Sequence, residues 1–475
     1  MPAKNSPKVL GTRKSVGRAL LALAVAFPFI ACGCAQFRSE PISASAGAAS
    51  FDARALDDPQ LTAFITELGG SGAYTLDRLT LTALYYHPNL EVSRSRFSAA
   101  MAAVKTARQI PNPQARLNFT AAPFSVSPVV SFLIETFGKR GKRTEVAQEL
   151  VQAAKDDIAN TSWLVRGGVR VAMLAVWGAE RRTAFLRRRL QLQEQLVQLL
   201  ERRLEEGEAS ALDVTRERIN RNQVSLALGD GERLRAEAYA RLAAATGVPA
   251  AAFAGKTLSF DAFERAPSPL MDVPELRRTA LTGRSDVQGL LAEYRAAEAG
   301  VRLEIANQYP NLLLAPGYNY SLGREEYLIA PAIAADLPIF NRNEGPIAEA
   351  EARRLGVAAR FVSLQARITG AIDTAAVSYR QADETVSTAD ALLTDARRRN
   401  DQISRSFEAG EADRPALVTA GIELVTAELS RFDAGLQQRQ ELGSLEDALQ
   451  HPLIDPNAHI FVPMTNPLLT SVSQP

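Results

Sequence analysis

Cysteine and histidine are scarce in this sequence of 475 residues, which contains two of the first and three of the second. Cys32 and Cys34 lie so close together near the N-terminus that they cannot cross-link a large folded domain. His87, His451 and His459 are not at the spacing of metal ligands. The sequence also has no nucleophile elbow, phosphate-binding loop or metalloprotease motif. It therefore predicts no catalytic, cofactor or metal site, and a protein that is not an enzyme.

Long hydrophobic runs are rare too, and the one that stands out is residues 19–30. Five basic residues and no acidic residue precede it, so we expect residues 1–33 to be a secretory signal peptide. The run is well short of the roughly 20 residues that a membrane-spanning helix needs. Small residues before each cysteine resemble a bacterial lipoprotein processing site, which makes Cys34, and after it Cys32, a candidate for lipid attachment. An ordinary signal peptidase site nearby is the alternative.

Aromatic content and net charge are both low. Aromatic residues make up 7% of the chain, and the formal charge of +1 falls to about −4 without the five basic residues of the signal peptide. A mildly acidic chain lacks the basic surface that nucleic acids bind, so no nucleic acid is expected as a partner. Ala, Leu, Arg, Glu and Gln dominate residues 141–246 and 342–449, a composition typical of long helices packed as coiled coils.

The most informative feature that is present is an internal repeat, in which residues 83–226 are echoed at 280–429. From Phe137 and Phe340 onward the two copies keep an offset of 203 residues, so that Gly-Glu-Ala at 207–209 recurs at 410–412. Two diverged copies of one strand-and-helix unit are typical of a structural conduit rather than an enzyme. Earlier in each copy, the pair Pro111-Asn112 of the first copy matches Pro310-Asn311 of the second.

Each copy offers one β-hairpin. Residues 79–110 predict a helix that Pro111 ends, and after it apolar residues such as Leu117 alternate with polar residues such as Arg116 and Asn118. Four strands in one chain leave two sheet edges unpaired, whereas three chains supply twelve strands, enough for a closed transmembrane barrel. Arg116 and Asn118 would then face a water-filled lumen. A small soluble sheet is the alternative.

A long helical hairpin follows each β-hairpin. Residues 141–206 contain no proline and, at about 1.5 Å per residue, could form a helix approaching 100 Å. Gly207 marks a turn before a returning helix, and Gly410 marks the same turn in the second copy. The sequence therefore predicts a mainly α-helical fold with a four-stranded contribution to a barrel.

The predicted organisation divides the chain at composition changes and at prolines. It consists of the signal peptide 1–33, a linker 34–74, a first repeat 75–246, a connector 247–273, a second repeat 274–450 and a loosely ordered tail 451–475. Within the repeats we expect hairpins at about 113–137 and 312–340, and long helices at 141–206, 211–246, 342–408 and 415–449.

These features together resemble the TolC-like outer-membrane efflux protein family over roughly residues 75–450. The resemblance implies a homotrimer in the outer membrane of a Gram-negative-type bacterium, with a twelve-stranded barrel continued by an antiparallel α-helical tunnel into the periplasm. It also implies a passive export duct with two protein partners, a periplasmic adaptor (membrane fusion) protein and an inner-membrane pump. A proton-driven pump is favoured. The alternatives are the duct of an ATP-driven type I protein secretion system and a non-transport coiled-coil scaffold.

A narrower resemblance concerns the cargo. Residues 135–143, Glu-Thr-Phe-Gly-Lys-Arg-Gly-Lys-Arg, resemble the Gly-Lys-Arg junction of CzcC-type members, which serve divalent-metal efflux. The resemblance implies divalent metal cations as cargo, with other small toxic compounds as the alternative. Another interpretation of the segment is a basic collar that contacts outer-membrane lipid phosphates.

The two helical turns are predicted to carry the gate and the adaptor contacts. The resemblance implies that Asp213, six residues after Gly207, lines the constricted end of the tunnel, where Arg414 could pair with it in the closed state. An acidic residue favoured at a helix start is the other interpretation of Asp213. The turns predicted to dock the adaptor are Gly207, Glu208, Ala209 and Ser210, and Gly410, Glu411, Ala412 and Asp413.

Overall fold

The computed structural model describes residues 36–70, 72–121, 124–265, 272–321 and 326–454. The predicted signal peptide, Cys32, Cys34 and most of the predicted tail lie outside these ranges. The chain divides into two units, 1–53 and 54–475. In the first unit, helix α2 (Ala44–Asp52) begins at Ser43, whose side chain accepts a hydrogen bond from the Ala46 amide.

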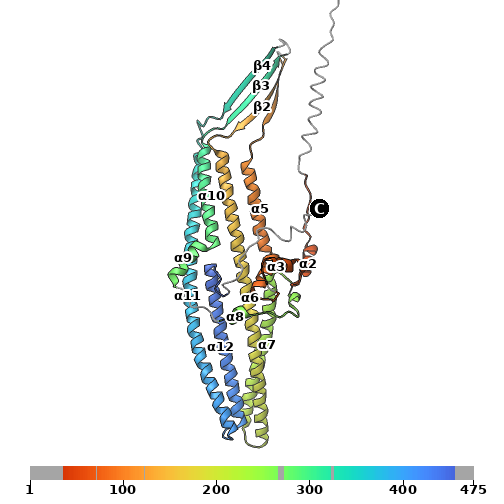
Figure 1. Cartoon of the computed structure of the whole chain (residues 1–475), viewed down its shortest axis with the longest axis vertical. Helices are drawn as coiled ribbons and strands as arrows, with labels where there is room; N and C mark the ends of the chain where they lie inside the picture. Colours follow the sequence, from red (N-terminus) through yellow and green to blue (C-terminus); the bar gives the residue numbers. More distant parts are fainter. Residues whose placement is uncertain (1–35, 71, 122–123, 266–271, 322–325, 455–475) are drawn as a thin grey trace, which may run out of the picture. The chain divides into compact units, whose positions relative to one another are not determined.

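The second unit is mainly helical, and the same order of elements occurs twice in it (Figure 1). After α3 (Pro59–Glu67), the first series is α4 (Leu76–Tyr86), α5 (Pro88–Arg108), β1 (Gln114–Ala121), β2 (Phe124–Ile134), α6 (Lys139–Glu205) and α7 (Ala211–Thr246). The short helices η1 (Ala250–Phe253) and α8 (Asp261–Glu264) follow. The second series is α9 (Val273–Gly283), α10 (Ser285–Asn307), β3 (Leu312–Ser321), β4 (Glu326–Ala335), α11 (Glu344–Glu408) and α12 (Arg414–Leu449).

The prediction of one helix over 79–110 was wrong. The structure has two helices there, because α4 ends at Tyr86 and α5 begins at Pro88. His87 between them is extended, with φ −72° and ψ 122°. A residue before proline is disfavoured in the helical region, and His87 also caps α5 by accepting a hydrogen bond from the Asn89 amide. The periodicity of apolar residues continued across this break and concealed it.

The four strands form one antiparallel sheet in the order β1-β2-β3-β4. Its register places apolar residues opposite one another on one face, where Leu117 pairs with Pro128 and Leu314 with Ile333. Several of these side chains are exposed, among them Leu117, Phe119, Phe132 and Ile333. Arg116 and Asn118 alternate with them and therefore lie on the other face. Within the described residues, β1 and β4 each have a strand neighbour on one side alone.

Two hydrophobic cores hold the helices below the sheet. The larger core joins α3, α4, α6, α7 and the connector, and Phe253 and Phe263 of the connector are buried in it. The smaller core joins α9, α10, α11 and α12 around Ile372 and Leu445. The connector is thus part of the folded structure, and an isolated β-bridge joins its Leu258 to Tyr74.

The long helices form two antiparallel hairpins, α6 with α7 and α11 with α12 (Figure 1). Helix α6 has 67 residues and α11 has 65, lengths of about 100 Å at about 1.5 Å per residue. Helix α12 also packs against α6, so the second hairpin is joined to the first along their length. None of the helices in the described ranges is both long and apolar enough to cross a membrane.

Candidate docking and gating site at the helical turns

Each long hairpin turns at a glycine in the left-handed conformation. The φ angle is 75° at Gly207 and 78° at Gly410, a region that residues with a Cβ adopt only at a cost. The amides after each glycine bond back to the preceding helix, Glu208 to the Arg203 carbonyl and Glu411 to the Ser406 carbonyl. The predicted turn glycines therefore have a local structural role.

The returning helices begin at capping residues in equivalent positions. Ser210 accepts a hydrogen bond of 3.1 Å from the Asp213 amide, and its hydroxyl donates to the Asp213 carboxylate at 2.7 Å. Asp413 accepts one of 2.9 Å from the Ala416 amide. Such caps satisfy amide groups that have no partner within the helix. Each turn thus has a defined geometry with an exposed tip, as a docking surface requires.

The predicted gate pair is not formed within the chain. Asp213 and Arg414 are both exposed, and the ion pairs of the described residues do not join them. Instead, Asp213 bonds to Ser210, which agrees with its interpretation as a helix-start residue. A role in a carboxylate ring formed by several chains stays a prediction.

A different ion pair joins the two turns. Arg203, near the end of α6, donates to the carboxylate of Asp413 at 2.6 Å, and its Nε lies 3.6 Å from Glu208. The Ala416 amide and, after it, the Arg203 guanidinium hold the pKa of Asp413 below its ordinary value. Sequence reasoning missed this pair, although the offset of 203 equates Asp413 with Ser210 and marks a carboxylate that only the second turn has.

The Arg203–Asp413 pair is the outermost of a series along the contact between α6 and α12. In the ion pairs between these helices in the described residues, α6 always contributes the arginine and α12, with its cap Asp413, the acid. The exposed members are Arg203–Asp413, Arg188–Glu428 at 2.8 Å and Arg182–Asp433 at 2.9 Å, and the inner members join Arg166 and Arg170 to Glu446 and Asp447. We call this series the α6–α12 seam.

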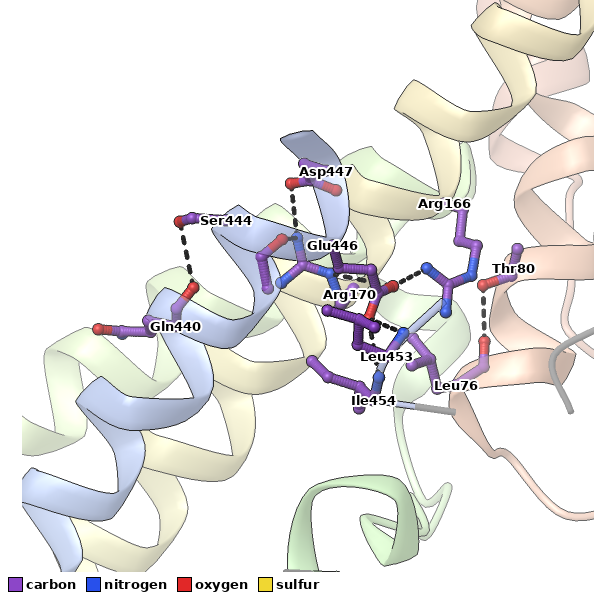
Figure 2. A network of polar contacts seen from close by, with 11 residues as sticks. Leu76, Thr80, Arg166, Arg170, Gln440, Ser444, Glu446, Asp447, Leu453 and Ile454 are labelled. Atoms are coloured by element: carbon purple, nitrogen blue, oxygen red, sulfur yellow. Dashed lines mark hydrogen bonds and ion pairs between the residues drawn. The ribbon is translucent and has the colours of Figure 1, made fainter. Parts of the chain in front are cut away.

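The inner end of the seam is buried, and Figure 2 shows the polar contacts that its residues make. Glu446 is 0% exposed, Arg170 1% and Arg166 3%, and the Arg166 guanidinium forms an ion pair with Glu446. The other carboxylate oxygen of Glu446 accepts hydrogen bonds from the amides of Leu453 (3.1 Å) and Ile454 (2.9 Å). One carboxylate therefore joins α6, α12 and the chain beyond α12.

Arg170 completes the network by binding a second acid. It donates to Asp447 at 2.6 Å and to the Gly443 carbonyl at 3.0 Å. Burial raises the pKa of Asp447, which Arg170 opposes. A side chain at Gly443 would overlap the Arg170 guanidinium, so this close approach requires glycine. The seam is thus firmly held at its inner end and exposed to water at the turns.

Three of the four cations at residues 139–143 have partners within the chain, and a basic collar that contacts lipid phosphates stays a prediction. Lys139 is buried, and its ammonium donates to the Tyr309 carbonyl at 2.6 Å and to Asn311 at 2.7 Å. Arg143 pairs with Glu135 at 2.6 Å. Lys142 donates to the Phe137 carbonyl at 2.9 Å. These cations hold the junction of sheet and helices together. The described residues contain no cluster of three or more side chains that could bind a metal ion.

Comparison with known proteins agrees with this architecture. Residues 81–248 match the family described as "Outer membrane efflux protein". The first half of the chain is therefore similar to this family over those residues. It is 23% identical over 385 residues to the cobalt-zinc-cadmium resistance protein CzcC of Cupriavidus metallidurans, covering 80% of this chain and 88% of that protein.

Two solved structures show that the fold is shared. The outer membrane protein VceC of Vibrio cholerae superposes with a TM-score of 0.63 at 17% identity, over 79% of this chain and 95% of that one. The Campylobacter jejuni CmeC outer membrane channel gives a TM-score of 0.61 at 14% identity, over 88% of this chain and 93% of that one. The helical hairpins and the four-stranded sheet of this chain therefore share the fold of these two structures.

Proposed function

We propose that the chain is the outer-membrane duct of a tripartite efflux system and conducts its cargo passively. The observation that carries this proposal is the four-stranded sheet, apolar on one face and with the polar side chains of β1 on the other, which continues directly into helices of about 100 Å. An exposed apolar face suits lipid, and a polar face suits a water-filled lumen.

The duct is a homotrimer built from two diverged copies of one unit in each chain. In the part of the chain that the structure describes, the outer edges of β1 and β4 are unpaired, and unpaired edges cannot remain in lipid because their backbone groups lack partners. Three chains supply twelve strands, and pairing β4 of each chain with β1 of the next closes the barrel. The helical hairpins of this trimer extend into the periplasm as a tunnel, and Cys34 is the favoured lipid attachment site.

The two turns dock a periplasmic adaptor, which connects the duct to an inner-membrane pump. We expect a photocrosslinking amino acid at Glu208 or Glu411, both exposed and outside the helix caps, to capture the adaptor in cells. The same probe at Arg353, exposed near the sheet end of α11, is the matched control and should not capture it. Mass spectrometry of the product identifies the partner.

The possible products of this experiment differ in meaning. An adaptor that works with a proton-driven metal pump supports the proposal. An adaptor of an ATP-driven exporter would assign the duct to protein secretion instead. Capture of no adaptor at either turn would contradict docking at this site.

Divalent metal cations are the favoured cargo, because the relative CzcC is a cobalt-zinc-cadmium resistance protein. We expect deletion of the gene to lower severalfold the concentrations of cobalt, zinc and cadmium that stop growth. A plasmid copy should restore resistance, and a copy lacking both turns should not. Unchanged metal tolerance with increased sensitivity to dyes or antibiotics would assign small toxic organic compounds as the cargo.

A further inference from the structure

One joint between sheet and helices is closed within the chain. At the start of α6, the ring of Phe137 stacks on the ring of Tyr309, which follows α10, with centroids 3.8 Å apart. The Thr136 hydroxyl donates to the Pro310 carbonyl at 2.6 Å, and Lys139 reaches the Tyr309 carbonyl and the Asn311 side chain. This closed joint connects the first half of the chain to the second.

The two halves are built alike at this level. In the first half, Arg143 at the start of α6 donates to the Ala107 carbonyl at 3.1 Å. In the second half, Asn343 at the start of α11 donates to the Glu304 carbonyl at 2.8 Å. Ala107 and Glu304 are the residues that the offset of 197 equates. Contacts within one half therefore have a counterpart in the other.

In the described residues of a single chain, the residues equivalent to those of the closed joint are exposed and do not pack on each other. The offset of 203 equates Phe137 with Phe340, which is 101% exposed, and Leu337 and Ile339 beside it are 71% and 65% exposed. On the other side, Ile110 precedes Pro111 just as Tyr309 precedes Pro310, and Ile110 is 67% exposed. Two apolar surfaces are thus present whose equivalents contact each other in the closed joint.

We propose that these surfaces meet between two copies of the chain. Leu337, Ile339 and Phe340 of one copy pack on residues 110–112 of the next, and Arg342 takes the place of Lys139 toward Asn112. Ile339 and Ile110 replace Thr136 and Tyr309, so the joint between chains is held by apolar packing more than the joint within the chain. The proposal rests on the proposed trimer, in which β4 of one copy lies beside β1 of the next.

The test places p-benzoylphenylalanine at position 340 in one of two co-expressed full-length copies with different tags. Irradiation should link the tags covalently, and the linked peptide should contain residues 110–112 of the partner copy. The same probe at position 137 is the matched control, because its target, Tyr309, belongs to the same chain. It should give an internal link without a rise in mass.

The outcomes separate this inference from the proposed trimer. A trimer by native mass spectrometry whose position 340 links to lipid, or to another part of the partner, overturns the joint and leaves the trimer standing. A monomer in the membrane overturns the trimer itself. As a second measurement, Phe340→Ala should make the trimer dissociate at a lower temperature, whereas the exposed control Leu355→Ala should not. Equal dissociation temperatures for both variants would also overturn the joint.

Discussion

Replacing Glu446 by alanine is expected to destabilise the protein by about 3–5 kcal/mol, the cost of breaking a buried ion pair by removing one partner. Arg166 and Arg170 would stay buried without the carboxylate that both face, and the amides of Leu453 and Ile454 would lose their acceptor. The measurements are the midpoint of thermal unfolding in detergent and the amount of folded protein in the membrane. We expect both to fall strongly.

Two variants show whether burial is the cause. Asp433→Ala removes the acid of an exposed pair on the same seam, with Arg182, and should cost only about 0–1 kcal/mol. Glu446→Gln keeps the size of the side chain and one acceptor oxygen but removes the charge, so its effect should lie between the two. If Glu446→Ala and Asp433→Ala unfolded at the same temperature, the network would not be the buried anchor described above.

Reversing the charge of Arg203 is expected to raise the passive ion conductance of the duct severalfold in planar bilayers. In Arg203→Glu, the new carboxylate faces Asp413 and Glu208, so repulsion replaces the attraction that holds the two turns together. The next pairs of the α6–α12 seam are also exposed, and water and salt screen their charges. The end of the seam at the turns should therefore separate first. The buried network at Glu446 should keep the inner end in place.

Two control variants either leave the ion pair between the two turns intact or restore it with the charges exchanged. Arg218→Glu breaks an exposed pair with Glu201 inside the first hairpin and should leave the conductance unchanged. The exchange Arg203→Asp with Asp413→Arg should restore the low conductance. If instead Asp213→Ala and Arg414→Ala raised the conductance and Arg203→Glu did not, closure would depend on the pair predicted from the sequence.

The pH dependence of the turn pair follows from Asp413. Because its pKa is lowered in the folded chain, its contribution to stability is present above the ordinary pKa of an aspartate and is lost only as the pH falls through the lower, folded value. The pair should therefore persist from about pH 8 to about pH 5, and the conductance should be flat over this range.

Much of the architecture followed from local properties of the sequence. The alternation in residues 114–121 predicted a strand, and Gly207 and Gly410 predicted the turns, because backbone conformation at these places depends on the residue itself and its near neighbours. The break at His87 was missed because the apolar pattern of a helix continued across it. A proline within such a pattern is a stronger signal than the pattern.

The candidate site was only partly predictable. The two turns and their exposed tips could be located from the repeat, and they lie at the ends of the hairpins as expected. The pairing of Arg203 with Asp413, and the burial of Lys139, could not be located. Arg203 precedes its partner by 210 residues, and several other arginines and acids nearby would satisfy the same sequence pattern.

The sequence by itself determined the kinds of element, their order and their turns, since these depend on short-range periodicity and on the conformational limits of glycine and proline. Only the tertiary structure decided which charges meet. The packing of α6 against α12 determines which arginine lies beside which acid along the seam. Burial at that contact determines whether a pair is exposed, as at the turns, or buried, as at Glu446. Both depend on packing between segments more than 200 residues apart, which local patterns do not encode.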